Sequence, residues 1–197
     1  MDLKDTLLKL VEPWIPSGSE PSNNDAIKQI FKQYCDEVKD DNLGNVIGVK
    51  KGISGDFKVM LAAHMDEIGL MVKEIDERGF LKFAFVGGVD QRILPAQTVV
   101  IHGDRDIFGV IGTKPPHIQD SEERKNAVKH EDMFIDTGLS VEDVKNHVKI
   151  GDYITFERNP IELANQRLSS NAQDDRAGVA VMLWALKELK KLSFDAD

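Results

Sequence analysis

The first 40 residues carry apolar side chains at the spacing of amphipathic helices. A stripe of leucines ends shortly before Pro13, which predicts a helix over residues 2–11. A loop containing serine and proline follows, and the Ser-Asn-Asn sequence at residues 22–24 offers a cap for a second helix. That second helix is predicted to run to about Val38.

Two apolar runs after residue 40 predict strands. Val46–Val49 follows a tight turn at residues 41–45, and Val59–Ala63 follows a second turn that contains glycine. Because Val59–Ala63 is apolar at every position, it is predicted to be a strand buried in a sheet. Two helices followed by two strands are typical of the start of an α/β fold.

Between residues 69 and 165 the pattern changes to short alternating runs separated by glycines. Such closely spaced strands predict a small β-barrel or sandwich. One amphipathic helix, Ser140–His147, interrupts the strands, with Ser140 at its cap. The predicted strands cover residues 70–75, 81–86, 98–101, 107–111 and 153–156.

Helical spacing returns near Asn165. Arg167–Ser170 is predicted to be a strand and Arg176–Lys191 a long helix. We therefore expect an α/β domain formed by residues 1–68 and 166–197, interrupted by an inserted β-rich domain at residues 69–165. The α/β domain would have so few strands that part of its sheet lacks a neighbour, so the domain is expected to be incomplete.

The composition excludes some classes of partner. The 197 residues carry a formal net charge of −9, which argues against a binder of nucleic acid or of anionic membranes. Cys35 is the single cysteine, so no internal disulfide is possible, and a small buried side chain is expected there. No leader and no apolar run of membrane-spanning length is visible. These features predict a cytoplasmic protein.

A histidine and an aspartate follow the apolar run at Val59–Ala63. His64 and Asp66 are two positions apart, so in extended chain their side chains point the same way. Asp66 would accept the proton of one ring nitrogen of His64 and leave the other nitrogen for a metal ion. The alternative is a loop histidine beside a solvated aspartate.

Two adjacent aspartates precede the last predicted helix. Asp174 and Asp175 lie where the helix dipole favours negative charge, and one carboxylate has enough lone pairs to bridge two cations. Gly178 would allow the helix to pack closely on a neighbour. The alternative is an ordinary aspartate cap with Asp175 and Arg176 solvated.

Together, the stretch from Ala63 to Leu70 and the stretch from Asp174 to Gly178 resemble the M42 family of metalloaminopeptidases. The resemblance extends over essentially the whole chain, including the β-rich insert. It implies an α/β metallopeptidase domain of the phosphorylase/hydrolase-like type with an inserted β-barrel that serves in dimerisation. It also implies two divalent metal ions, zinc or cobalt, and hydrolysis of N-terminal residues from peptide substrates. Further matching segments are residues 41–45, 87–97, 109–117, 136–140 and 151–152.

The resemblance also implies roles for three residues. His64 would ligate one metal ion, and Asp174 would bridge both ions through a carboxylate next to a cis peptide bond with Asp175. Asp66 is the candidate catalytic residue because it would orient His64. The metal ions would activate water, and a glutamate would accept its proton.

The chain departs from the family pattern in what it lacks. The family's adjacent glutamate pair, a further acidic ligand and a second histidine would all follow residue 197, so this chain is expected to be inactive alone. Glu122-Glu123 is an adjacent pair, but its charged surroundings predict a solvated turn. Asn171 and Gln173 replace a lysine and an apolar residue that are common in the family. Histidines 102, 117, 130 and 147 are expected to be surface or packing residues.

Two other functions remain open. A glycan hydrolase would need two carboxylic acids at a defined spacing and no metal, which fits the histidine poorly. A non-catalytic assembly module is the second alternative, because the strands between Leu70 and Val86 could pair with another chain. The resemblance favours a homo-oligomer formed through the insert.

Overall fold

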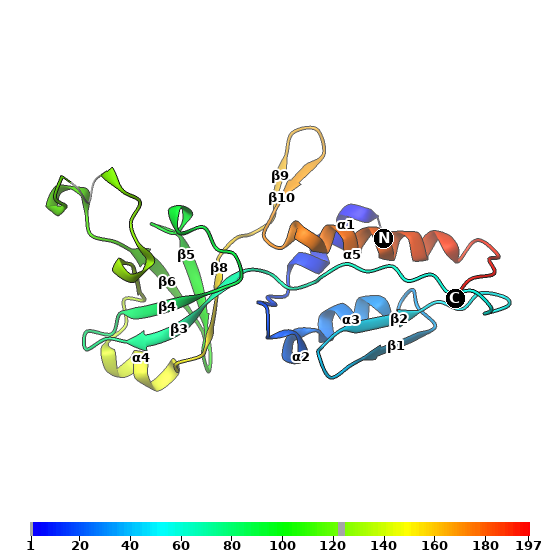
Figure 1. Cartoon of the computed structure of the whole chain (residues 1–197), viewed down its shortest axis with the longest axis horizontal. Helices are drawn as coiled ribbons and strands as arrows, with labels where there is room; N and C mark the ends of the chain where they lie inside the picture. The colour runs from blue at the N-terminus through cyan, green and yellow to red at the C-terminus, as the bar shows by residue number, and fades with distance from the viewer. Residues whose placement is uncertain (1, 122–124) are drawn as a thin grey trace. The chain divides into compact units, whose positions relative to one another are not determined.

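The computed structural model of the chain describes residues 2–121 and 125–197, so the pair Glu122–Glu123 lies outside the described residues. The described residues form two compact units (Figure 1). One unit, the helical unit, extends to Glu67 and resumes at Asn159, and the other, the barrel unit, spans Ile68–Arg158. The sequence predicted boundaries after residues 68 and 165. The second boundary differs because the segment from Asn159 onward groups with the helical unit.

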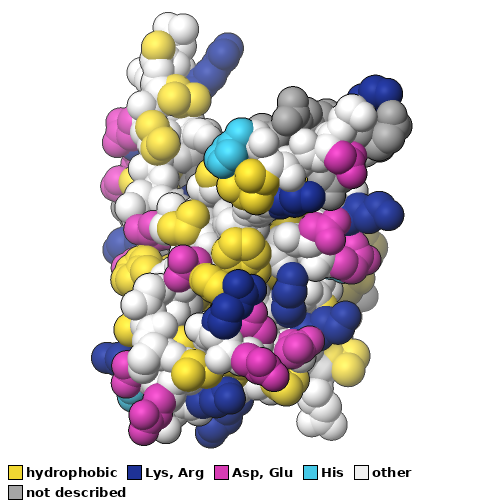
Figure 2. Space-filling view, turned by 90° about the vertical axis from the view of Figure 1, so that its left-hand side faces the viewer, with side chains coloured by type: hydrophobic (Ala, Val, Ile, Leu, Met, Phe, Trp, Pro, Cys, Tyr) yellow, Lys and Arg dark blue, Asp and Glu magenta, His cyan; other side chains and the backbone are white. Residues whose placement is uncertain are grey.

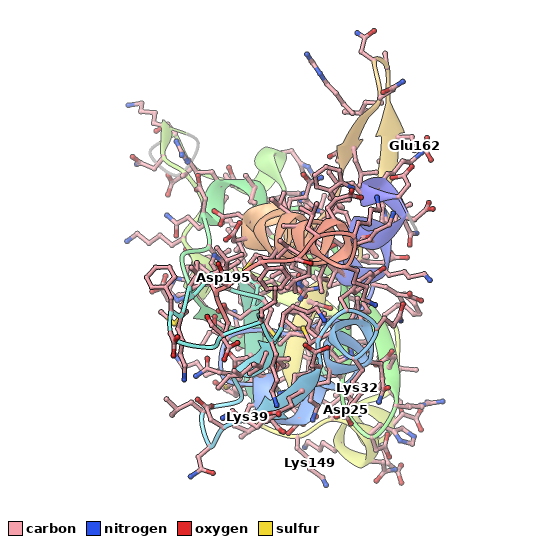
Figure 3. The ribbon with its side chains drawn as sticks, turned by 90° about the vertical axis from the view of Figure 1, so that its right-hand side faces the viewer. Asp25, Lys32, Lys39, Lys149, Glu162 and Asp195 are labelled. Atoms are coloured by element: carbon pink, nitrogen blue, oxygen red, sulfur yellow. The ribbon has the colours of Figure 1, made fainter. Side chains whose placement is uncertain are left out.

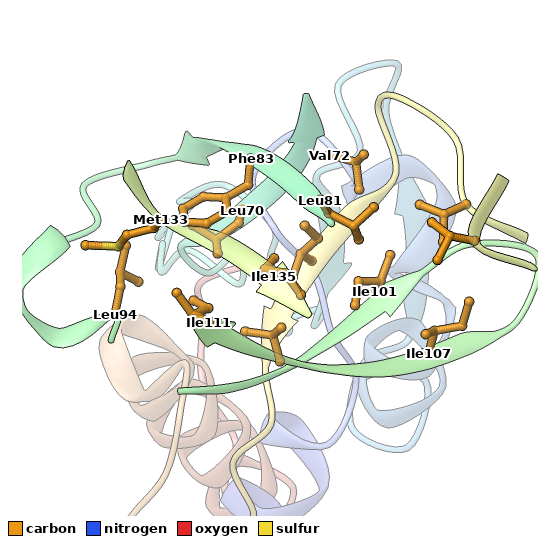
Figure 4. Close-up of a cluster of buried hydrophobic side chains, with 14 of the residues drawn as sticks. Leu70, Val72, Leu81, Phe83, Leu94, Ile101, Ile107, Ile111, Met133 and Ile135 are labelled. Carbon is orange, nitrogen blue, oxygen red and sulfur yellow. The ribbon is translucent and has the colours of Figure 1, made fainter. Parts of the chain in front are cut away.

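Residues 68–158 form a closed barrel in which every neighbouring pair of strands is antiparallel. Side chains alternate between the interior and the outer surface, most regularly along β6 (Asp106–Gly112), because successive side chains of a strand point to opposite faces. Figure 4 shows the apolar interior, which includes Leu81, Ile101 and Ile135. The strands in barrel order are β3 (Gly69–Ile75), β4 (Leu81–Val86), β7 (Phe134–Asp136), β6, β5 (Thr98–His102) and β8 (Tyr153–Phe156).

The closed barrel contains the predicted strands and one further strand, β7, that the sequence pattern did not reveal. Strand β7 is three residues long, too short for alternation to be visible. Its central residue, Ile135, pairs with Leu81 on one side and with Ile111 on the other. This closure uses both outer edges of the β3–β4 hairpin, since β3 also pairs with β8. The predicted pairing of that hairpin with another chain therefore lacks a free full-length edge.

Smaller elements connect the strands of the barrel. The predicted helix over Ser140–His147 is observed as α4 (Val141–His147), and the side-chain oxygen of Ser140 accepts the N–H of Asp143 at its start. Short 3-10 helices in these connections include η1 (Gln91–Ile93), η2 (Pro116–Ile118) and η4 (His130–Asp132).

The other unit is organised around two helices that pack together. Helix α1 (Leu3–Val11) packs against α5 (Gln173–Leu189) (Figure 1), and the predicted helix over residues 2–11 is observed with Asp2 as its cap. The buried face of these helices contributes to a second apolar core. That core contains Leu10, Ile15, Ile27, Ile30, Phe31, Val179, Ala180 and Leu183.

The second predicted helix is shorter than its apolar pattern indicated. It is divided into α2 (Glu20–Asn23) and α3 (Asp25–Phe31), with Asn24 between them. The chain then turns and forms β1 (Glu37–Asp40), which pairs with the predicted strand β2 (Val46–Val49). The prediction of helix to Val38 is wrong because pairing with β2 supplies backbone hydrogen bonds that override the helical spacing. Cys35 lies in the turn and packs beside the core, and burial raises the pKa of its thiol.

The predicted buried strand Val59–Ala63 is not observed. The segment is extended, and Val59, Met60 and Leu61 are exposed by 55%, 88% and 57%. The backbone N–H of Val59 donates a hydrogen bond to the Asp197 carbonyl at 2.9 Å. An apolar run becomes a buried strand only where neighbouring strands pair with it, and the described residues supply no ladder here. In Figure 1 this segment is the cyan trace between α5 and α3.

A short hairpin precedes the last helix. Strands β9 (Ile161–Leu163) and β10 (Arg167–Ser169) pair with each other, and β10 matches the predicted strand at Arg167–Ser170. Figure 3 labels Glu162 on this hairpin; its carboxylate forms an ion pair with Lys4, 2.6 Å apart.

Acidic and basic side chains lie next to each other on the face shown in Figure 2, with apolar side chains among them. The described side chains on this face thus form no continuous basic surface, in line with the acidic composition. Among the residues that the structure describes, every helix is too short or too polar to cross a lipid bilayer.

Candidate metal centre

His64 and Asp66 follow the extended segment and lie in a loop of the helical unit. Nδ1 of His64 is 3.1 Å from Oδ1 of Asp66, so a carboxylate holds this ring nitrogen. The His64 side chain is 54% exposed and that of Asp66 30% exposed. The spacing of two residues thus places the two side chains together, as the extended backbone predicted.

Asp174 reaches the same histidine from the other end of the sequence. Its Oδ1 is 3.1 Å from Nε2 of His64. Asp174 and Asp175 have non-helical backbone angles inside α5, and regular helix begins at Arg176, where the sequence predicted it. Ala172 precedes them with φ of 52°, in the left-handed region. The peptide bond between Asp174 and Asp175 is cis, as the resemblance implied.

Asp175 does not face His64 but caps the regular part of α5. Its Oδ1 accepts the N–H of Gly178 at 3.1 Å, which satisfies one of the free N–H groups at the helix start. A side chain at position 178 would collide with this carboxylate, since a Cβ there would lie 2.5 Å from Oδ1. Gly178 therefore makes room for the cap of its own helix, and its predicted close packing on a neighbouring element stays a prediction.

The two carboxylates change the charge state of the histidine. Burial lowers the pKa of His64, but the hydrogen bond to Asp174 and the charge of Asp66 raise it, and the net pKa lies above the ordinary value. Both ring nitrogens face carboxylate oxygens, so a positive charge between them is favoured. A proton on Nε2 can supply that charge, and so can a metal ion in its place.

The His64–Asp174 pair fits the donor chemistry of a zinc or cobalt ion. Imidazole nitrogen and carboxylate oxygen are ordinary ligands of these metals. Two ligands of one tetrahedral ion lie about 3.4 Å apart, close to the 3.1 Å between Nε2 and Oδ1. Within residues 2–121 and 125–197, however, no group of three or more His, Cys, Asp or Glu side chains is arranged to hold a metal ion.

Arg176, one of the residues expected in the alternative interpretation to be solvated, is completely buried. Its guanidinium donates hydrogen bonds to the carbonyl oxygens of Met65, Leu10 and Pro13. Nη2 also lies 3.4 Å from Oε1 of Glu67, whose side chain is 6% exposed. Burial lowers the pKa of Arg176, and the charges of Glu67 and Asp66 oppose this effect. The prediction of a solvated Arg176 is therefore wrong.

Glu67, the negatively charged partner of Arg176, also contacts distant segments of the chain. Its Oε1 accepts the N–H of Ile15 at 3.1 Å, and its Oε2 accepts the side-chain amide of Asn171 at 2.9 Å. Asn171 therefore has a defined role in the loop although it departs from the family pattern. Gln173, the second departure, donates to the carbonyl of Leu168 at 2.8 Å. Sequence reasoning missed Glu67 and Arg176 because their partners are distant in the chain.

The remaining histidines belong to the barrel unit. His102 lies between Asp106 and Thr155 with 2.8 Å to each, and His147 lies 3.0 Å from Asp104. His130 stacks beside Phe85, and His117 is exposed. All four lie in the barrel unit, so they fit the expectation of surface or packing residues.

Comparisons with known proteins identify the family. The profile of the M42 glutamyl aminopeptidase family matches residues 44–197. The chain belongs to the M42 glutamyl aminopeptidase family.

Relatives of this M42 chain are considerably longer than the chain itself. Lysyl aminopeptidase of Pyrococcus furiosus is 34% identical over 92% of this chain and 53% of its own length. An aminopeptidase from the archaeon Desulfurococcus kamchatkensis is 40% identical with a TM-score of 0.88, over 98% of this chain and 54% of its own. The TET1 peptidase of Pyrococcus horikoshii is 32% identical with a TM-score of 0.81, over 95% and 56%. The chain thus spans about half the length of the relatives it matches.

These similarities confirm the predicted fold class for the M42 chain, an α/β metallopeptidase domain with a β-barrel insert. Outside the barrel, the described residues form two two-stranded sheets, β1–β2 and β9–β10. The matched part of each relative reproduces both units.

The buried ion pair of this M42 chain generates a stability prediction. Replacing Arg176 by Met leaves Glu67 charged and unpaired in the interior, so the free energy of unfolding should fall by about 3–5 kcal/mol. Adding Glu67→Gln should restore part of the loss because it removes the unpaired charge. Urea unfolding followed by the fluorescence of Trp14 and Trp184, which both lie in the helical unit, measures the effect.

The matched control is Arg167→Met, which makes the same replacement at an exposed position of β10. Its unfolding free energy should change by less than about 0.5 kcal/mol. Equal losses for the two arginine variants would show that the buried guanidinium does not hold the unit together.

Proposed function

We propose that this chain carries part of the metal centre of an aminopeptidase that removes N-terminal residues from peptides. The observation that supports the proposal best is the meeting of Nε2 of His64 and Oδ1 of Asp174, whose residues are 110 positions apart. The names of the relatives, lysyl aminopeptidase among them, support the class of reaction.

In this proposal each site residue has a separate task. His64 and Asp174 would hold a zinc or cobalt ion, and the Asp174 carboxylate would serve both ions of a two-metal centre. Asp66 holds the Nδ1 proton of His64, which fixes the ring and leaves Nε2 unprotonated for the ion. When bound, such metal ions polarise the scissile carbonyl and lower the pKa of bound water.

We also propose that the chain is inactive by itself. Catalytic zinc normally needs three protein ligands and an open position, whereas His64 and Asp174 supply two donors. The Asp174 side chain is 96% exposed, so water competes freely for any ion held there. Val59, Met60 and Leu61, which precede His64 in the sequence, also have exposed side chains.

The metal centre predicts weak but specific binding of Co²⁺. His64→Ala and Asp174→Ala should each weaken Co²⁺ binding by more than about 100-fold. Removing a residue that only hydrogen-bonds to a metal ligand already costs about 10- to 100-fold in affinity, and removing the ligand itself costs more. The visible absorption of the Co²⁺-titrated chain at pH 8 measures the change and reports nitrogen and oxygen ligation.

Two exposed residues provide controls for this titration. His117→Ala and Asp195→Ala (Figure 3) remove the same side-chain types elsewhere and should leave Co²⁺ binding unchanged. If all four variants bind Co²⁺ as the parent chain does, the proposed centre at His64 and Asp174 is wrong.

A second prediction concerns turnover. The purified chain, supplied with Co²⁺ or Zn²⁺, should hydrolyse aminoacyl-p-nitroanilides no faster than its His64→Ala variant prepared in parallel. The variant controls for traces of host peptidase. Turnover by the parent chain that persists through repurification, and that His64→Ala abolishes, would contradict inactivity while supporting the metal centre.

We further propose that the chain forms homo-oligomers through the barrel. TET1 peptidase can assemble into a tetrahedron or a large octahedral shell, which supports assembly in this family. The outer face of β6 presents Phe108 and Val110, exposed by 59% and 47%, with Val100 opposite Phe108 on β5. Contiguous apolar side chains on an outer surface are typical of interfaces between proteins.

Sedimentation velocity of the full chain tests this assembly. The parent should sediment as a dimer or larger species, and Phe108→Glu should shift it toward the monomer because a buried charge opposes association. Ile150→Glu, at a residue that is 71% exposed elsewhere on the barrel unit, is the matched control and should remain associated. A monomeric parent chain would rule out the proposal.

The alternatives have less support. A glycan hydrolase would not need a histidine between two carboxylates, and the family match favours peptide hydrolysis. EDTA sensitivity of any turnover would separate metal-dependent peptide hydrolysis from glycan hydrolysis.

A reducing compartment such as the cytoplasm fits the single, half-buried Cys35.

A further inference from the structure

Ser17 lies in the loop between α1 and α2, beside the loop that carries His64. The backbones of the two loops run parallel at this point, with a bridge between Pro16 and Glu67. The N–H of Ser17 donates to the carbonyl of Glu67 at 3.2 Å, and the N–H of Glu67 donates to the carbonyl of Ile15 at 2.9 Å. These two bonds fix the register of the loops, so Ser17 lies next to Asp66.

The Ser17 hydroxyl contacts the oxygen of Asp66 that His64 does not use. An ionised carboxylate can only accept, so the hydroxyl donates to Oδ2 of Asp66. The other oxygen, Oδ1, faces Nδ1 of His64 at 3.1 Å. With both oxygens engaged, the Asp66 carboxylate has a defined plane, and that plane determines the orientation of the imidazole.

The Ser17 loop is itself held by the buried ion pair. Oε1 of Glu67 accepts the N–H of Ile15, and Arg176 donates to the carbonyl of Pro13. The backbone that leads into Ser17 is therefore anchored at Pro13 and Ile15, and the Ser17 N–H is itself bonded to the Glu67 carbonyl. This rigidity is what a group that orients a metal ligand requires.

We propose that Ser17 is a positioning residue of this site, which holds Asp66 so that His64 carries its proton on Nδ1 and presents Nε2 toward Asp174. The inference rests on the proposed function in that Nε2 is the atom that would bind the metal ion. Ser17 touches neither the ion nor the substrate and acts through Asp66. The exposed Asp174 carboxylate competes with water and is the weaker acceptor for the ring proton.

The first test reads the ring proton in the metal-free chain. Long-range ¹H–¹⁵N correlation spectra at pH 9 distinguish the Nδ1–H and Nε2–H tautomers of neutral His64. The parent chain should show mainly Nδ1–H, and Ser17→Ala should shift the population toward Nε2–H. Ser17→Thr keeps a hydroxyl and should restore the parent spectrum. Ser22→Ala, an exposed serine in α2, is the matched control.

The second test uses Co²⁺ as the probe. Ser17→Ala should raise the dissociation constant for Co²⁺ about 10- to 100-fold, as is typical when an outer partner of a ligand is removed. Ser17→Thr and Ser22→Ala should bind as the parent does. Far-UV circular dichroism and urea unfolding of each variant show whether the fold is retained.

The outcomes separate this inference from the proposed function. If Ser17→Ala retains both the Nδ1–H tautomer and the parent affinity for Co²⁺, Ser17 does not position His64 and the inference fails. If the parent chain binds no Co²⁺ but Ser17→Ala changes the tautomer, the proposed metal centre fails while the role of Ser17 stands. A loss that Ser17→Thr does not restore would show a packing role and would also overturn the inference.

Discussion

The contact between the Arg176 guanidinium and the Glu67 carboxylate is the constraint on which the helical unit depends. Both side chains are buried, and a buried ion pair is tolerated only when the remaining donors and acceptors also find partners. Here the partners are backbone groups of the α1–α2 connection and of the loop after His64, together with the Asn171 amide. The pair thus ties three distant stretches of chain to one point.

The site follows from this junction. Because the three stretches meet at Glu67 and Arg176, the side chains beside them are brought together as well: Asp66 next to Ser17, and Asp174 opposite His64. The polar junction is buried, while the His64–Asp174 pair is open to solvent. Rigid support for an accessible histidine–aspartate pair is the arrangement that the proposed metal centre needs, since its ligands must be oriented without being covered.

Much of the barrel followed from the sequence, because each of its strands buries one face. Alternating burial is clear along β5 and β6, and β3, β4 and β8 were found from their short apolar runs, whereas the three-residue β7 was missed. The helical unit was harder to predict. The apolar run Val59–Ala63 signals burial, but no sheet among residues 2–121 and 125–197 includes it, and the helical spacing near Val38 was overridden by pairing with β2.

By itself, the sequence determined the family, the alternation of the barrel strands and the two motifs that contain His64 and Asp174. Those features depend on residues close together in the chain, where spacing and local backbone geometry decide. Only the tertiary structure decided that Arg176 is buried rather than solvated, that Asp175 caps a helix while Asp174 faces His64, and that Ser17 contacts Asp66. Those contacts join residues far apart in sequence, and no periodic pattern records which distant backbone carbonyl a buried guanidinium will find.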